Sequence, residues 1–125
     1  MAYLIDTDIL VDYIRKNPNA TEYLNSVGAW SYSVVTAMEL YLGARNNNEV
    51  ASLDKFLSLF PEIPLSEESG ARGRDILRKY SKSDGLDPLD ALIAASAITG
   101  NFRLATKNQK HFRNIEGLDL EVPEY

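Results

Sequence analysis

The sequence predicts an α/β fold: a single three-layer domain in which a mostly parallel central sheet is flanked by helices. Short runs rich in apolar and β-branched residues alternate along the chain with segments whose apolar residues recur at helical spacing. Such alternation is typical of β-α-β units, whose parallel strands are buried on both faces. The chain has 125 residues and no repeat, low-complexity segment or linker, so residues 1–125 are expected to form one domain.

The first 35 residues predict two strands and two helices. Residues 2–5 indicate a short buried strand, and the helix after it is marked by apolar residues at helical spacing: Ile9, Leu10, Tyr13 and Ile14. Asn17-Pro18 should end that helix, and residues 21–27 can form a second one. Residues 29–35 alternate in polarity and end in β-branched residues, which favours a strand.

The middle of the chain predicts two helices, a short strand and a further helix. Thr36, with Glu39 three residues later, matches a capping box, so a helix is expected from Thr36 to about Arg45. A turn at residues 46–48 should precede an amphipathic helix with the inward residues Val50, Leu53, Phe56, Leu57 and Phe60. Residues 62–65 favour a strand, and residues 66–81 favour a helix whose first half is weakened by glycines.

The last third predicts one enclosed helix between short strands. Asp87-Pro88 should open this helix, because proline at the first helical position loses no hydrogen bond, and Gly100 should end it. Residues 102–106 and 118–122 favour strands, with a helical turn at residues 108–112 between them. Functional sites in such folds lie at the carboxyl ends of the strands, where Asp6 and Thr106 are expected.

Composition excludes several classes of protein. No apolar stretch reaches the roughly 18 residues of a membrane span, and no basic region precedes an apolar leader, so we expect a cytoplasmic protein without a secretion signal. The absence of cysteine excludes disulfides and thiolate metal sites and leaves oxygen ligands, which favour magnesium or manganese over zinc. The net charge of −5 disfavours a protein that coats nucleic acid through its positive charge.

Charge is nevertheless unevenly distributed. Residues 1–12 contain three aspartates and no base, whereas residues 103–113 contain basic residues, the single histidine and no acid. An acidic pocket beside a basic strip could hold a metal and a phosphate together, with Arg103, Lys107 and the hydroxyl of Thr106 as phosphate contacts. The alternative is an ordinary solvated helix face.

Three acids stand isolated in apolar sequence. Asp6 follows a buried strand, Glu39 is the only charged residue between Glu22 and Arg45, and Asp90 is followed by twelve uncharged residues. A buried carboxylate must be paired, protonated or bound to a cation. Each acid also has a structural explanation: Asp6 as a helix cap, Glu39 in a capping box and Asp90 as the partner of an Asp87 cap. Together, however, they suggest one shared cation, held by Asp6, Glu39 and Asp90.

His111 is open to two interpretations. It could act as a general base, or it could be a surface or packing residue, which is the commoner role of a lone histidine. The aromatic residues at apolar-face spacing are expected in the core: Tyr3, Tyr13, Trp30, Phe56 and Phe60.

Four segments, in order, resemble the PIN-domain ribonucleases, and most closely the VapC-type toxins of prokaryotic toxin–antitoxin pairs. YLIDTDIL at residues 3–10 resembles their opening strand and acid, and SVVTAMELYLGA at residues 33–44 resembles their Thr-x-x-Glu-Leu-x-x-Gly segment. LDPLDALIAASA at residues 86–97 and LATKNQKHFRNI at residues 104–115 resemble their Asp-x-Leu-Ile-Ala-Ala helix and closing segment. The resemblance implies a PIN-like domain.

The resemblance also implies roles for individual residues. Asp6, Glu39 and Asp90 correspond to metal-binding acids, and the fourth acidic position is occupied here by Asn108, so we expect one firmly held ion rather than two. Asp8 stands where relatives often have asparagine, and could supply part of the missing charge. The hydroxyl residues expected to orient carboxylates or water are Thr7, Thr36 and Thr106.

The implied activity is Mg²⁺- or Mn²⁺-dependent hydrolysis of RNA phosphodiester bonds by an endoribonuclease toxin. The implied partners are single-stranded or looped RNA, a cognate antitoxin protein and a second copy of the chain in a homodimer. A PIN domain kept only for binding is one alternative, because Asn108 weakens the acidic set. A receiver-type signalling domain or a haloacid-dehalogenase-type phosphatase would also combine an acidic magnesium pocket with an α/β fold.

Overall fold

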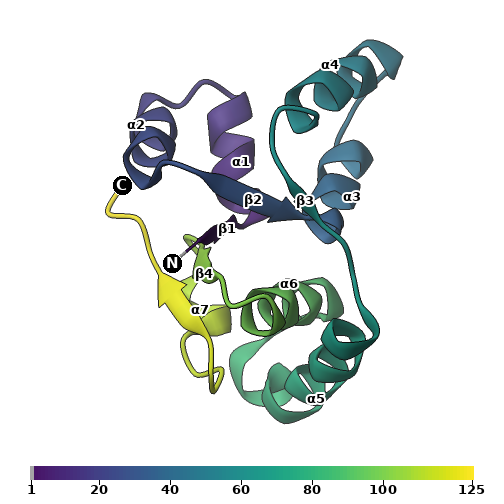
Figure 1. Cartoon of the computed structure of the whole chain (residues 1–125), viewed down its shortest axis with the longest axis vertical. Helices are drawn as coiled ribbons and strands as arrows, with labels where there is room; N and C mark the ends of the chain where they lie inside the picture. Colours follow the sequence, from purple (N-terminus) through teal and green to yellow (C-terminus); the bar gives the residue numbers. More distant parts are fainter. Residues whose placement is uncertain (1) are drawn as a thin grey trace.

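The computed structural model describes residues 2–125 as an α/β domain with a five-stranded parallel sheet (Figure 1). The strands are β1 (Tyr3–Ile5), β2 (Trp30–Ser33), β3 (Glu62–Ile63), β4 (Arg103–Ala105) and β5 (Asp119–Glu121). Their order in the sheet is β3-β2-β1-β4-β5, and every adjacent pair is parallel. The predicted α/β class and parallel sheet are therefore confirmed.

Within residues 2–125, seven helices connect and cover the strands. They are α1 (Thr7–Ile14), α2 (Pro18–Val27), α3 (Val34–Leu42), α4 (Asn47–Leu57), α5 (Glu67–Asp84), α6 (Pro88–Thr99) and α7 (Gln109–Phe112). Figure 1 shows α5 and α6 together on one side of the sheet and α1, α2 and α4 on the other. No helix formed by residues 2–125 is long and apolar enough to cross a membrane.

Two apolar cores, one on each face of the sheet, make the three layers. Successive residues of β1 point to opposite faces: Leu4 joins the core beneath α5 and α6, and Ile5 joins the core beneath α1, α2 and α4. In β4, Leu104 and Ala105 divide in the same way. The predicted core aromatics lie in or against the second core, where the Trp30 ring stacks on Phe60 with centroids 3.8 Å apart.

Helix α6 is enclosed, as its apolar sequence predicts. Six of its residues are buried, and Ala94 and Ala97 have no exposed surface. Gly73 in the neighbouring helix α5 allows close packing, because a Cβ there would lie 3.0 Å from the Leu92 side chain. Gly73 lowers the helix propensity of α5, but its lack of a side chain lets α6 pack closely against α5.

The prediction that Thr36 starts a helix is wrong. Helix α3 begins at Val34, because the Ser33 side chain accepts a hydrogen bond from the Val35 N–H (3.0 Å) and caps the helix. Strand β2 consequently stops at Ser33 instead of continuing to Val35. Thr36 lies within the first turn of α3, fully buried, so no Thr36–Glu39 capping box forms.

Other element boundaries differ by a few residues. Helix α2 begins at Pro18 because Asn17 caps it, accepting from the Asn19 N–H (2.9 Å). Helix α4 begins at Asn47, with Asn46 as its cap, where a turn was predicted. Strand β3 is limited to Glu62–Ile63, whereas α5 extends to Asp84 and ends at Gly85 with a φ of 69°.

Candidate metal-binding active site

Asp6 lies at the junction of β1 and α1, at the carboxyl end of the central strand. Its side chain is only 6% exposed. One carboxylate oxygen accepts a hydrogen bond from the Thr7 N–H (2.8 Å), which caps α1, and the other accepts from the Thr106 hydroxyl (2.7 Å). The parallel pairing of β1 with β4 brings Asp6 and Thr106 to the same edge of the sheet.

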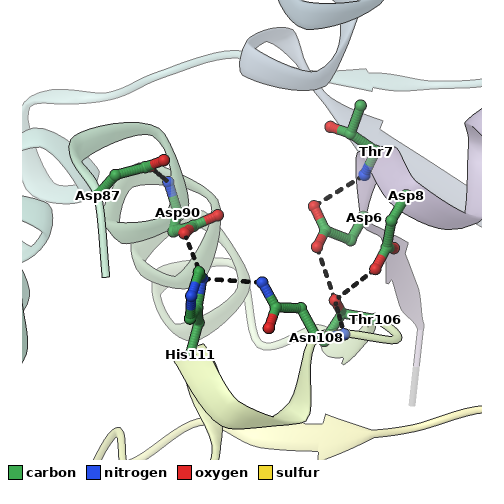
Figure 2. A network of polar contacts seen from close by, with 8 residues as sticks. All are labelled: Asp6, Thr7, Asp8, Asp87, Asp90, Thr106, Asn108 and His111. Carbon is green, nitrogen blue, oxygen red and sulfur yellow. Dashed lines mark hydrogen bonds and ion pairs between the residues drawn. The ribbon is translucent and has the colours of Figure 1, made fainter. Parts of the chain in front are cut away.

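Asp8 shares the Thr106 hydroxyl with Asp6 (Figure 2). Its Oδ2 accepts from the Lys107 N–H (3.0 Å) and lies 3.3 Å from the Thr106 hydroxyl, whereas its Oδ1 is buried without a hydrogen-bond partner in the described chain. A buried oxygen without a partner has lost its water and gained no replacement. Asp8 Oδ1 is therefore a free acceptor beside Asp6.

Burial dominates the electrostatics of these two carboxyls. Burial, with the negative charge of Asp8, raises the pKa of Asp6 from 3.8 to about 7, and the charge of Asp90 acts in the same direction. Burial also raises the pKa of Asp8. In the metal-free protein the pair therefore resists carrying two negative charges, which a nearby cation would relieve.

Asp90 reaches this region from the first turn of α6. Asp87 caps that helix by accepting from the Asp90 N–H (2.8 Å), so the predicted cap is correct. The Asp90 carboxylate itself contacts His111, with Oδ2 3.1 Å from Nδ1, and Figure 2 shows it on the side of α6 that faces Asp6. Burial, followed by the charge of Asp87, raises the pKa of Asp90.

Glu39 is joined to Asp6 through Thr7. The Thr7 hydroxyl donates to Glu39 Oε1 (2.6 Å) and lies 3.0 Å from the Thr36 hydroxyl, while the Thr7 N–H binds Asp6. Residues three apart on a helix share a face, so Thr36 and Glu39 of α3 both reach Thr7. The half-buried Thr7 is thus the structural link between Asp6 and Glu39, with the buried Thr36 beside it.

Asn108 and His111 lie on the side of the candidate site opposite Asp6. The Asn108 N–H donates to the Thr106 hydroxyl (3.1 Å), which fixes the loop after β4. Its side-chain Nδ2 lies 2.8 Å from His111 Nδ1. His111 is therefore in contact with two candidate site residues, and its side chain is 30% exposed.

Of the three predicted phosphate contacts, Thr106 is fully buried with its hydroxyl on Asp6 and Asp8, and the two basic residues occupy different places. Lys107 lies at the rim, where its ammonium donates to Asp12 and sits 5.3 Å from the centre of the Tyr125 ring. Arg103 lies at the amino end of β4 and pairs with Asp119 (3.2 Å) and Glu121 (3.7 Å), so it is not part of this cluster. Arg103 begins β4, whereas Lys107 follows the end of this strand, so the length of β4 separates the two side chains.

Asp12 and Tyr125 were not predicted from sequence. The Tyr125 hydroxyl donates to Asp12 Oδ2 (3.0 Å), and the Lys107 ammonium holds the pKa of Asp12 below its usual value. Asp12 lies one helical turn after Asp8, so the helical spacing of the two acids was an available signal. The position of Tyr125 had no local signal.

The donor set fits a hard divalent cation in an open site. In the region described, residues 2–125, no three histidine or acidic side chains gather closely enough to enclose an ion by themselves. Asp6 and Asp8 offer carboxylate oxygens on one side, including the unpartnered Asp8 Oδ1, and Asp90 faces them from α6. Mg²⁺ is commonly held by one or two carboxylates while keeping several waters, so this arrangement suits it.

Comparison with known families decides the identity of this fold. The family model described as "PIN domain" matches residues 3–118. The chain belongs to the PIN domain family. The receiver-type and phosphatase-type alternatives are therefore wrong.

Curated relatives match this chain over nearly its whole length. Ribonuclease VapC19 of Mycobacterium tuberculosis is 36% identical over 125 residues, covering 96% of this chain and 98% of the relative. Ribonuclease VapC1 of Methanocaldococcus jannaschii is 32% identical over 120 residues, covering 95% and 85%.

Solved structures share the arrangement of elements. A toxin–antitoxin complex from Klebsiella pneumoniae matches with a TM-score of 0.84 and 29% identity, covering 97% of each chain. VapBC2 from Rickettsia felis, bound to a DNA fragment from its promoter, matches with a TM-score of 0.79 and 31% identity, covering 98% of each chain. The PIN fold therefore extends across this chain.

Proposed function

We propose that this PIN-domain protein is a Mg²⁺- or Mn²⁺-dependent endoribonuclease toxin that hydrolyses RNA phosphodiester bonds in the cytoplasm and is neutralised by a cognate antitoxin. The relatives named ribonucleases and the toxin–antitoxin complexes support this proposal. The observation that carries it is the buried Asp6 carboxylate, linked through Thr7 to Glu39 and facing Asp90.

In this proposal, Asp6, Asp8, Glu39 and Asp90 hold one cation, directly or through its waters. A bound divalent cation would supply the positive charge that polarises a phosphate and lowers the pKa of a water molecule. Asn108 offers only a neutral oxygen, so a second ion would be held weakly. We therefore expect one firmly bound ion.

The remaining residues prepare the site for that chemistry. Thr106, which has no exposed surface, fixes Asp6 and Asp8 through its hydroxyl, and Thr7 fixes Asp6 and Glu39. The Lys107 ammonium, held at the rim by Asp12, would contact a phosphate of the RNA. The acids repel a bare phosphate, so substrate binding depends on the cation.

A cleavage assay tests the proposal. The purified chain is incubated with a mixture of labelled single-stranded RNAs in Mn²⁺, in Mg²⁺ and with excess chelator. We expect cleavage only with a divalent cation, and a loss of at least about 100-fold in E39Q and D90N, the range seen when a transition-state charge contact is removed. E116Q, at an exposed glutamate paired with Lys79, is the matched control. Cleavage that survives the chelator, or E39Q and D90N variants as active as the parent, would refute it.

A binding-only PIN domain is the second candidate, favoured by Asn108 in place of a fourth acid. Such a protein, loaded with Mn²⁺, would retain RNA in a filter-binding assay without cleaving the RNA. N108D would then be expected to introduce cleavage, because it adds the missing carboxylate. Cleavage by the parent rules this candidate out.

An apolar groove between α1, α2, α3 and α4 suits the antitoxin. It measures about 1390 Å³, contains Glu39, and is lined by these apolar residues: Val11, Ile14, Leu40, Ala44, Leu53 and Phe56. An amphipathic antitoxin segment could bury its apolar face there and present a cation to Glu39. Expression of the chain should arrest growth, and co-expression of the adjacent gene's product should restore it; no arrest would contradict the toxin role.

We also expect a homodimer. The outward face of α3 exposes Met38 and Leu42, which are 64% and 87% exposed and one helical turn apart. Sedimentation of the parent and of the M38K/L42K variant measures the oligomeric state. A parent that sediments as a monomer at micromolar concentration would contradict the dimer.

A further inference from the structure

One nitrogen of His111 contacts two residues of the proposed cation site. Nδ1 lies 3.1 Å from Asp90 Oδ2 and 2.8 Å from the amide of Asn108 (Figure 2). Asp90 begins α6, whereas Asn108 and His111 belong to the segment after β4. His111 is therefore the side chain that ties these two segments together at the site.

The chemistry of the three groups fixes which atom carries the hydrogen. An ionised carboxylate only accepts hydrogen bonds, and an imidazole nitrogen either donates or accepts. The contact with Asp90 therefore requires a hydrogen on Nδ1. If Nδ1 instead accepted from Asn108, its lone pair would face the negative oxygen of Asp90.

The same argument fixes the amide of Asn108. The structure places Asn108 Nδ2 at this contact, but an N–H at His111 Nδ1 cannot accept a hydrogen bond from an amide NH₂. The tautomer therefore requires the reversed amide, with Oδ1 in the place of Nδ2 and the Nδ1 hydrogen shared between Asn108 and Asp90. The two ends of an amide have nearly the same shape, so this orientation keeps the 2.8 Å contact. Figure 2 shows that this end of Asn108 points toward the space between Asp90 and Asp6.

The other side of the ring lies close to Gly85, the residue that ends α5. A Cβ at Gly85 would lie 3.7 Å from His111 Nε2, and the φ of 69° at this position already favours glycine. His111 thus lies among the end of α5, the start of α6 and helix α7.

We propose that His111 is a positioning residue whose Nδ1–H holds the Asp90 carboxylate and turns the oxygen of Asn108 toward the cation site. This inference rests on the proposed function, because it concerns the same cation. It gives Asn108 the oxygen that a neutral ligand needs, in the place of the missing fourth acid. His111 does not itself contact the reacting phosphate.

Nitrogen NMR of the metal-free protein tests the position of the hydrogen. His111 is the only histidine in the chain, so its two ring nitrogens can be assigned without mutants. When the ring carries a single hydrogen, we expect that hydrogen on Nδ1 and none on Nε2. The opposite tautomer would overturn the inference, and this result does not depend on cleavage.

Metal affinity tests the positioning role. In H111N an amide nitrogen replaces Nδ1 as the donor, whereas H111L removes it; K110N, at an exposed neighbour, is the control. Loss of a group that orients a metal ligand typically weakens metal binding by ~10–100-fold. We expect this loss of Mn²⁺ affinity in H111L, and affinities within about threefold of the parent in H111N and K110N, measured by calorimetry with unfolding midpoints recorded for each variant.

The outcomes separate the two proposals. A parent that binds no Mn²⁺ refutes the cation site, and therefore the proposed function. A parent that binds Mn²⁺ while H111L binds it equally well overturns only the role of His111, as does an H111N variant as weak as H111L. If H111L does not fold, H111Q takes its place, because the longer glutamine side chain does not put a donor at the Nδ1 position. A Mn²⁺ affinity of H111Q equal to that of the parent would then overturn the inference.

Discussion

Replacing Asp6 by asparagine should stabilise the metal-free protein while abolishing its proposed activity. Asp6 is 6% exposed, and burial with the Asp8 charge raises its pKa from 3.8 to about 7. A group with a raised folded-state pKa contributes most stability below its unfolded pKa and loses that contribution as the pH rises through the folded pKa. Above pH 7 the ionised Asp6 carboxylate therefore destabilises the folded protein. Replacement by asparagine removes this destabilisation.

The size of the effect follows from these values. Each pKa unit corresponds to about 1.4 kcal/mol, so the rise from 3.8 to about 7 corresponds to roughly 4 kcal/mol at pH 8. Asparagine can accept only one of the two hydrogen bonds from Thr7 and Thr106, which costs about 1 kcal/mol. We therefore expect the free energy of unfolding of D6N to exceed that of the parent by about 2–3 kcal/mol at pH 8. At about pH 4.5 the two free energies of unfolding should be nearly equal.

Urea unfolding in excess chelator, at both pH values, measures this difference. Saturating Mn²⁺ should reverse the order at pH 8, because only the parent gains free energy from binding the ion. A D6N variant that is no more stable than the parent at pH 8, or whose advantage is the same at both pH values, would refute the burial argument. D54N, at an exposed aspartate of α4, is the control.

Three further predictions concern neighbouring groups. T106V should lower the free energy of unfolding by about 1–3 kcal/mol and weaken Mn²⁺ binding, because it removes the fully buried hydroxyl that Asp6 and Asp8 share. T106S keeps this hydroxyl and should behave as the parent in urea unfolding and calorimetry. R103A should cleave RNA at the parental rate, since Arg103 lies at the opposite end of β4 from the site; a tenfold loss would contradict this placement. G100A should lower the free energy of unfolding by about 1–3 kcal/mol in urea, because its Cβ would lie 2.4 Å from the Phe102 ring; an unchanged midpoint would show that the ring moves freely.

Residues with a strong local signal could be predicted from the sequence. The apolar run before Asp6 predicts a buried strand with an acid at its carboxyl end, and the Asp87-Pro88 pair predicts the start of α6 to the residue. Both signals reflect short-range physics: β-branched and apolar residues favour buried strands, and proline is accepted at the first helical position. The parallel order of the sheet then brings Asp6 and Thr106 together.

Residues whose position depends on the tertiary fold could not be predicted. Val34 and Val35 favour a strand locally, but Ser33 caps a helix at that point, so Thr36 lies inside α3 and Glu39 faces Thr7 instead of a cap. Arg103 and Lys107 look like one basic strip in sequence, yet β4 carries them to different edges of the sheet. Tyr125 reaches Asp12, 113 residues away, through a contact that no local pattern encodes.

The position of β1 in the middle of the sheet affects when the protein can act during its synthesis. One neighbour, β2, follows within 30 residues, whereas the other, β4, is about 100 residues away and lies beyond α6. A nascent chain that has left the ribosome only as far as α5 carries Asp6 and Glu39 but has neither Asp90 nor the Thr106 hydroxyl. The growing polypeptide consequently cannot assemble the proposed site until its last third has emerged and closed the sheet.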